Sequence, residues 1–325
     1  MSAGRGLRRW VLAGGLLGGG LALAQPAAPV VSPARSATEP ARCPPPLPEL
    51  TDSQLVAQDR GLLWRATREG RTIHLFGTLH VGKPQWRALG PLTRSALRAS
   101  EVLALEIDPN DPALLKALQD TRPPQPLPEP LQQRLDRAFE RACLTTEALA
   151  TLHPVLQATM LTMLEARWLG MDTRFAMEQL LATQARQQGL RIVALESAAT
   201  QIRALVPDDE AAARLLLAQS LQQLEDRSAR RVLGKLGAAW EAGDLAALAD
   251  YGRWCECTAS EEARQFLRQL NDDRNAPLAD GIERLHAQGG KVFVAVGALH
   301  FTGPQSLPRL LAQRGFKVER MPFQR

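Results

Sequence analysis

The chain alternates short apolar runs with helix-like segments, and this alternation restricts its possible folds more than any other feature. Two runs within LLWRATREGRTIHLFGT (62–78) flank a Glu-Gly turn and predict a β-hairpin. The helix-like PLTRSALRAS (91–100) then leads to EVLALEID (101–108), and strand, helix, strand is typical of a parallel crossover. RIVALES (191–197), KVFVAVGALH (291–300) and LPRLLAQRGFKVERM (307–321) continue the pattern.

Long segments rich in Leu, Ala, Gln and Arg separate these strands. They cover 112–189 and 202–289 with apolar residues at helical spacing, and a proline-rich region at 123–130 interrupts the first. The sequence therefore predicts an α/β domain. We expect a mixed, mostly parallel central sheet of about six strands, beginning with the N-terminal hairpin and carrying a large helical insertion.

The N-terminus has the three parts of an export signal. A basic region with Arg5, Arg8 and Arg9 precedes a glycine-rich apolar stretch and then Ala22-Leu23-Ala24, a small-residue cleavage signal. About 14 apolar residues fall short of the roughly 20 that span a bilayer, which argues against a membrane anchor. We expect residues 1–24 to be a signal peptide, 25–54 a Pro/Ala-rich linker and 55–325 a single domain. The adjacent arginines leave both the Sec and the twin-arginine route open.

Charge and localisation follow from this division of the chain. Cleavage after Ala24 removes three arginines and reduces the formal net charge from +5 to +2, too small to indicate a nucleic-acid partner. The middle helices lack the basic amphipathic face that a membrane surface requires. The sequence predicts a periplasmic or secreted bacterial protein without stable membrane insertion after signal cleavage.

Four cysteines, Cys43, Cys143, Cys255 and Cys257, remain in the mature chain. An even number in an oxidising compartment predicts two disulfides. Because Cys255 and Cys257 are close in sequence, we expect each to bridge elsewhere, to Cys43 and Cys143 in either order. A Cys-x-Cys metal site is the alternative, but the chain has no second such pair.

Residues able to bind a metal or move a proton follow four of the predicted strands. Gly77-Thr78-Leu79-His80 and Gly297-Ala298-Leu299-His300 end two of them in the same Gly-x-x-His pattern. Glu106 and Asp108 end a third strand, and Glu196 ends a fourth. Because ligands of open α/β sheets bind at the carboxyl ends of strands, we expect these side chains to form one site.

Two imidazoles and one or two carboxylates suit a divalent ion such as Zn, Mn, Co or Fe. Such an ion lowers the pKa of bound water, and a free carboxylate can act as general base. The glycines would allow sharp turns with a close backbone approach. The alternative for each histidine is a hydrogen-bonding loop residue, and for each carboxylate a helix cap.

The chain resembles the TraB/GumN family, whose animal relatives are the TIKI proteins, over about residues 55–325. The resemblance rests on LFGTLHVG, LALEID, GMDTRF, IVALESAATQI, DDRN and VAVGALHFTGPQSLPRLLAQRGFKVER. It implies a fold like those of the EreA, ChaN and TIKI proteins and a metal-dependent site, with TIKI members described as proteases that use manganese or cobalt.

The resemblance also implies roles for individual residues. His80, His300 and Glu106 match the metal positions, and Glu106, Glu196 and Arg274 the catalytic positions. Gly77, Gly297, Asn275 and Asp172 match other motif positions. Arg274 could hold a substrate carboxylate or an oxyanion, or could pair structurally with Glu196 or Asp172. Asp172 could cap the following helix.

These observations favour an exported metal-dependent hydrolase, a peptidase acting on a peptide or other small substrate. Its cofactor would be a divalent Mn, Co or Zn ion held by the two Gly-x-x-His motifs and Glu106. The alternative is a non-catalytic periplasmic protein that binds a metal, haem or peptide in cell-surface or polysaccharide processes, because the chain lacks a stringent motif such as H-E-x-x-H. We expect the other histidines, His74, His153 and His286, to be structural or solvent-exposed.

Overall fold

A computed structural model describes residues 43–121, 126–258 and 260–323 of the chain. The expected signal peptide, 1–24, and the linker as far as residue 42 lie outside these ranges. Residues 43–54 of the linker are described and form no strand; they contain a short 3-10 helix at Asp52–Gln54.

The described ranges form one mixed sheet of six strands in the order β4-β3-β5-β2-β1-β6. The pairs β4–β3, β3–β5 and β5–β2 are parallel, whereas β2–β1 and β1–β6 are antiparallel. This confirms the predicted α/β class and the mostly parallel sheet. The strands are β1 (Leu62–Arg68), β2 (Arg71–Thr78), β3 (Val102–Leu105), β4 (Arg191–Ala194), β5 (Val292–Gly297) and β6 (Lys317–Met321).

Glu69 and Gly70 form the two-residue turn between β1 and β2. Both have positive φ, 53° and 72°. A two-residue turn of this kind matches the twist of the strands that it joins. The predicted hairpin is therefore confirmed, with Arg68 opposite Arg71 at its end.

Most of the helices lie between β3 and β4 and between β4 and β5, where the sequence predicted the helical insertion. Helix α1 (Pro91–Arg98) precedes β3, and the helices between β3 and β4 are α2 (Pro112–Gln119), α3 (Glu129–Arg141), α4 (Pro154–Leu164) and α5 (Met177–Gln187). Between β4 and β5 lie α6 (Ala198–Leu205), α7 (Glu210–Glu225), α8 (Ser228–Glu241), α9 (Leu245–Ala249), α10 (Tyr251–Trp254), α11 (Glu261–Leu270) and α12 (Asp272–Ala287). Helix α13 (Leu307–Gln313) precedes the last strand.

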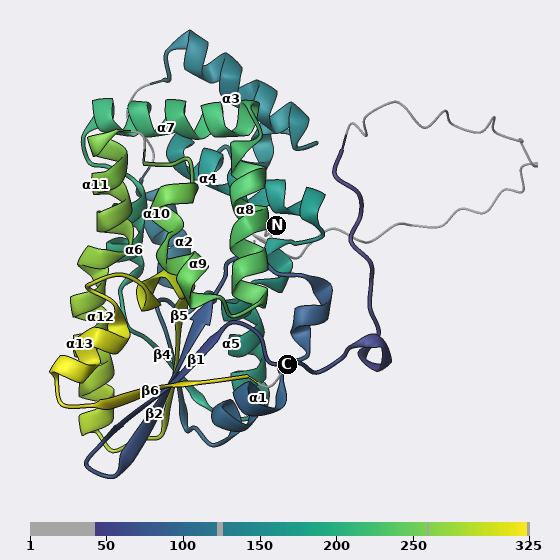
Figure 1. Cartoon of the computed structure of the whole chain (residues 1–325). Coiled ribbons are helices and arrows are strands. Elements are labelled where there is room, and N and C mark those ends of the chain that lie inside the picture. The colour runs from purple at the N-terminus through teal and green to yellow at the C-terminus, as the bar shows by residue number, and fades with distance from the viewer. Residues whose placement is uncertain (1–42, 122–125, 259, 324–325) are drawn as a thin grey trace, which may run out of the picture.

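Helices cover the sheet and extend beyond one end of it. Figure 1 shows α12 and α13 on one side of the sheet, α1 and α5 on the other, and α3, α4 and α7 stacked beyond the end. The contacts agree, since α12 packs on β5 and α13 on β1, while α5 packs on β3 and β4. Strand β4 lies at the sheet edge and is partly exposed, so it is less buried than RIVALES suggested.

The described residues contain two hydrophobic clusters. One is centred on the sheet and includes Phe76, Leu103, Phe293 and Trp240. The other lies among α3, α4, α6 and α7 and includes Phe139 and Leu221. The second cluster gives the helical portion a core of its own, against which α2 and α6, the helices that follow β3 and β4, are packed.

The cysteine pairing differs from the prediction. Cys43 bonds to Cys143, and Cys255 bonds to Cys257. The residue between the latter two, Glu256, has φ 55°, and this left-handed turn brings their Cα atoms to 5.0 Å. That separation lies within the normal disulfide range, so short spacing along the chain does not prevent the bond. The first disulfide joins the linker to the residue that follows the C-cap of α3.

No helix within the described ranges is both long enough and apolar enough to cross a membrane.

Candidate functional site

The carboxyl ends of four strands place the predicted residues at one edge of the sheet. Thr78, near the end of β2, lies opposite Gly297 at the end of β5. Leu105 of β3 pairs with Ala295 of β5 and with Ala194 of β4. His80, Glu106, Glu196 and His300 each follow one of these strand ends by one to three residues.

Glu106 is the centre of a buried polar cluster. Its Oε1 accepts a hydrogen bond from the backbone N–H of Gly297 at 2.6 Å. Its Oε2 accepts bonds from the guanidinium of Arg274 and from Nε2 of Gln201, the latter at 3.2 Å. Only 5% of the Glu106 side chain is exposed. The carboxylate therefore has four close polar neighbours once His300, described below, is included.

Arg274, in the first turn of α12, joins the two buried glutamates. Its Nε donates to both oxygens of Glu196 at 3.1 and 3.2 Å, and its Nη2 donates to Glu196 Oε2 at 2.9 Å. The same Nη2 also binds Glu106. Of the alternatives raised by the sequence, the structure shows pairing with Glu196 and not with Asp172. Two carboxylates thus share one guanidinium, a site suited to its planar fork.

The cluster shifts the pKa values of its acidic members in opposite directions. Burial by itself would raise the pKa of Glu106, but the His300 and Arg274 side chains lower it below its ordinary value. Burial raises the pKa of Glu196, and the hydrogen bonds from Arg274 only partly offset this effect. Glu106 is therefore ionised at neutral pH.

His300 lies in the 3-10 turn Ala298–Phe301 and is 2% exposed. Its Nδ1 lies 2.7 Å from Oδ1 of Asn275, and its Nε2 lies 3.6 Å from Glu106 Oε1. Burial lowers the pKa of His300 to about 4, so the imidazole is neutral at pH 7. Because an amide oxygen can only accept, Nδ1 carries the proton of the neutral imidazole and Nε2 carries the lone pair.

His80 lies at the same sheet edge but is held by a residue that the sequence did not predict. Its Nδ1 is 3.2 Å from Oε1 of Glu178, and that oxygen also accepts a hydrogen bond from Thr78. The carboxylate of Glu178 raises the pKa of His80 to about 9, although 61% of the imidazole is exposed to screening solvent. The positive charge of His80 in turn lowers the pKa values of Glu106 and His300.

The two motif glycines allow close approach at the strand ends. A Cβ on Gly297 would lie 3.2 Å from Glu106 Oε1 and 3.5 Å from the His300 ring. A Cβ on Gly77 would lie 3.1 Å from the Cα of Ala298, and the Gly77 carbonyl accepts a hydrogen bond from Trp240. The absence of a side chain at Gly297 thus lets its N–H reach Glu106 directly.

Asp172 is buried but separate from this cluster. Its carboxylate accepts hydrogen bonds from the backbone N–H of Arg174 at 2.9 Å and from Nε of Arg167 at 2.7 Å. Its own backbone forms two hydrogen bonds with Gly82, which fix the segment after His80. Asp172 caps the short helix Thr173–Phe175, which confirms the prediction that it could cap the helix that follows it.

Asp172→Asn should lower the free energy of unfolding by about 1.5–3 kcal/mol at pH 7, because a neutral amide replaces a buried acceptor of charged donors. Burial alone would raise the pKa of Asp172, but the Arg174 N–H and Arg167 hold it below its ordinary value. The carboxylate's contribution is therefore present above about pH 4 and is lost as the pH falls through the folded-state pKa. Urea unfolding at pH 7 and pH 3 measures both effects.

The matched control for this prediction is Asp208→Asn, at an exposed aspartate. We expect it to change the free energy of unfolding by less than about 0.5 kcal/mol. An Asp172→Asn difference that stayed constant from pH 7 to pH 3 would contradict the assigned role.

Two residues of the site were not predicted. Glu178, in the first turn of α5, resembles an ordinary acidic residue near a helix N-terminus, and its only sequence signal was proximity to the GMDTRF motif. Gln201, on α6, lies within the IVALESAATQI motif but was not singled out. Among the predicted strand-end residues, Asp108 does not join the cluster, because it pairs with Arg186 at 2.8 Å.

The other histidines have structural contacts. His153 caps α4, with Nδ1 accepting from the Val155 N–H at 3.2 Å, and His286 is buried with Nε2 3.1 Å from the Arg68 carbonyl. His74 is half-buried in β2. None of the three approaches the strand-end cluster through a polar contact that involves the described residues.

Within the described ranges, no group of three or more His, Cys, Asp or Glu side chains is arranged to hold a metal ion. The donor chemistry nevertheless fits a divalent ion. Both His80 and His300 bind an oxygen through Nδ1, which leaves Nε2 for a metal, and this support is usual for histidine ligands. Glu106 adds an ionised carboxylate beside His300.

Comparison with known proteins agrees with the resemblance seen in the sequence. The profile of the TraB/PrgY/gumN family matches residues 62–320. An uncharacterized protein, YbaP of Escherichia coli (strain K12), is 27% identical over 252 residues, which cover 74% of this chain and 88% of that protein. No solved structure matches the chain, so its likeness to the EreA, ChaN and TIKI folds stays a prediction.

Proposed function

The chain belongs to the TraB/PrgY/gumN family, and we propose that it is an exported, metal-dependent hydrolase of the peptidase type. The proposed ligands of the divalent ion are His80, His300 and Glu106. When bound, such an ion lowers the pKa of a coordinated water and polarises a substrate carbonyl.

The observation that carries the proposal is the hydrogen-bonding pattern that the two motif histidines share. Each imidazole lies after one of two neighbouring strands, and each binds a fixed oxygen through Nδ1. Their Nε2 atoms are the nitrogens left for a ligand. Two histidines with purely structural roles would not be expected to share this arrangement on two separate segments.

The chain's own residues supply the remaining functions. Arg274, the charged His80 and the Gly297 N–H keep Glu106 ionised at neutral pH, where His300 is uncharged. Asn275 fixes the His300 tautomer. His80 would lose a proton on binding a metal, since the ligand form of imidazole is neutral. Glu196 and Arg274 act as positioning residues for Glu106, because neither has an exposed side chain.

We also infer export to the periplasm or beyond it. The basic and apolar N-terminus supports this, as do the two disulfides, since disulfides persist in oxidising compartments. We propose that the cofactor is a Mn, Co or Zn ion.

Metal analysis tests the shared site. We expect purified wild-type protein, after incubation with Mn²⁺, Co²⁺ or Zn²⁺ and desalting, to keep about one ion per chain. His80→Ala and His300→Ala should each bind the ion at least 10- to 100-fold more weakly, because each removes one of the three proposed ligands. Titration calorimetry measures this weakening.

The matched control is His74→Gln, on the same strand as the first motif, which should bind as the wild type does. Equal metal content in the double variant His80→Ala/His300→Ala and in the wild type would reject the site. Metal binding without turnover of any peptide in a library would instead favour the non-catalytic binding protein.

A further inference from the structure

A cavity of about 810 Å³ lies between α2 and α6, next to the strand-end cluster. Helix α2 follows β3 and Glu106, and α6 follows β4 and Glu196. Ser197, the residue after Glu196, lines the cavity and caps α6 with its hydroxyl. Gln201 on the same helix donates to Glu106. One helix therefore contacts both the cluster and the cavity.

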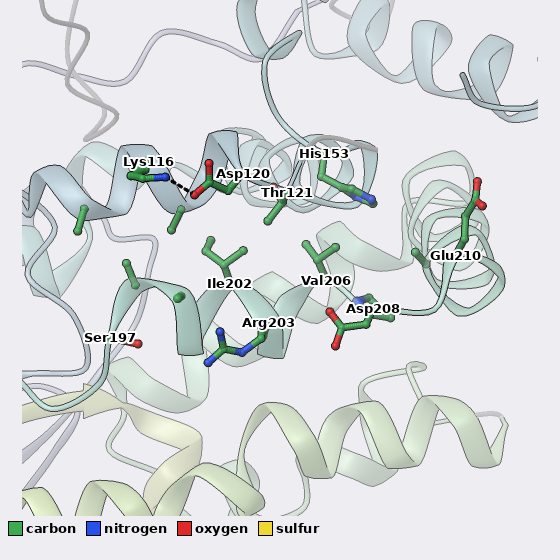
Figure 2. A pocket seen from close by; sticks show the side chains of 16 residues that line it. Lys116, Asp120, Thr121, His153, Ser197, Ile202, Arg203, Val206, Asp208 and Glu210 are labelled. Carbon is green, nitrogen blue, oxygen red and sulfur yellow. Dashed lines mark hydrogen bonds and ion pairs between the residues drawn. The ribbon is translucent and has the colours of Figure 1, made fainter. Parts of the chain in front are cut away.

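The walls of the cavity are apolar and rigid. Figure 2 shows Ile202 of α6 and Val206, the residue after this helix, pointing toward α2 across the space. Ala117 of α2 and Ala213 of α7 also line it, and these small side chains leave the space open. Ile202, Val206 and Ala213 belong to the second hydrophobic cluster, so they are fixed by packing on their other sides. The volume is in the usual range for ligand sites.

Charges around the cavity nearly balance. Two basic side chains, Lys116 and Arg203, face three acidic ones, Asp120, Asp208 and Glu210. Lys116 is already paired with Asp120 at 2.7 Å. A balanced rim does not favour a polyanion, whereas an apolar floor with polar edges suits a peptide that presents an apolar side chain.

A haem is a poorer occupant for this cavity. His153 is the histidine that lines it, and its Nδ1 accepts a hydrogen bond from the Val155 N–H. The proton is then on Nε2, so that nitrogen has no lone pair for iron. Ligation would require His153 to give up the cap of α4.

We propose that the α2–α6 cavity binds an apolar side chain of a peptide substrate, close to the bond that is cleaved. This inference rests on the proposed hydrolase function and adds a substrate class to it. An apolar side chain would enter between Ala117 and Ile202 while the peptide backbone continues toward the strand ends that carry Glu106 and Glu196.

Matched peptide pairs test the proposal. Internally quenched peptides that differ only by Leu or Gly, at each of three positions on either side of the scissile bond, would be compared with metal-loaded protein. We expect Leu to raise kcat/KM at least tenfold at one position. Ala117→Trp fills the cavity and should abolish that preference, so that the Leu and Gly peptides give kcat/KM values within twofold of each other.

Ala238→Trp, on an exposed part of α8 outside the cavity lining, is the control and should retain the Leu preference. Should Ala117→Trp fail to fold, Ala117→Leu is expected to weaken the preference partially. The assignment would be overturned if the wild type cleaved the Leu and Gly peptides with equal kcat/KM. It would also be overturned if the Ala117 variants kept the wild-type preference for Leu.

Binding to metal-free protein separates the two proposals. We expect a fluorescein-labelled Leu peptide to bind the wild type at least tenfold more tightly than Ala117→Trp, measured by anisotropy. If this holds but no peptide is hydrolysed, the cavity assignment stands and the hydrolase function fails. The assignment would be overturned if the wild type bound no peptide but showed a haem absorption band that is absent from Ala117→Trp.

Discussion

Arg274→Met is expected to lower the free energy of unfolding by about 3–5 kcal/mol at pH 7. The substitution leaves Glu106 and Glu196, 5% and 2% exposed, without the guanidinium that both share. Two buried carboxylates then lose the positive charge that they share. Chemical denaturation, with the transition followed by tryptophan fluorescence, measures the loss.

The pH dependence identifies the cause of this loss. Removal of Arg274 should raise the folded-state pKa of both carboxyls, so the penalty is present when the unfolded chain is ionised, above about pH 4.3. It should shrink as the pH is lowered through that value. Arg65→Met, which breaks an exposed pair with Glu319, is the control and should cost about 1 kcal/mol or less. A similar loss of unfolding free energy in both variants would show that the buried cluster stabilises the fold no more than an exposed ion pair does.

Glu106→Gln is expected to lower kcat/KM for peptide hydrolysis by roughly 10²- to 10⁴-fold. An amide cannot act as a general base, and it is a poorer metal ligand than a carboxylate. It also cannot satisfy both of its donor neighbours. If its oxygen accepts from the Gly297 N–H, its NH₂ group faces Arg274, and the reverse orientation opposes Gly297. Steady-state kinetics with saturating metal measure the effect.

Asp108→Asn provides the matched control for Glu106→Gln. Asp108 follows the same strand two residues later but pairs with Arg186 outside the cluster. Its activity should stay within about twofold of wild type. Full activity of a folded Glu106→Gln protein would show that this carboxylate is not needed for the reaction, which would contradict the proposed mechanism.

The sequence allowed the sheet and the cluster to be predicted where the signals were local. Each strand was an apolar run with a turn or glycine stop beside it, so the hairpin and the parallel strands could be recognised. The site residues at strand ends followed from the rule that parallel strands present their carboxyl ends at one edge. Glu106, Glu196 and His300 meet Arg274 and Asn275 at that edge.

Features that depend on tertiary packing could not be predicted. Glu178 is brought to His80 because α5 packs beside the end of β2, and no spacing rule relates residues 80 and 178. The Cys255–Cys257 bond depends on the left-handed conformation of one intervening residue. The α2–α6 cavity is formed by two helices that are about 80 positions apart, each of which resembles an ordinary amphipathic segment.

The position of β5 determines when the site can form during synthesis. This strand joins the β4–β3 pair to the β2–β1 hairpin, yet it comes from residues 292–297 of 325. A nascent chain that ends before it has two unconnected halves of a sheet and no second histidine motif. Folding must therefore wait for contacts of very high sequence separation, which form slowly. A chain still attached to the ribosome at that stage would accordingly lack the complete candidate site.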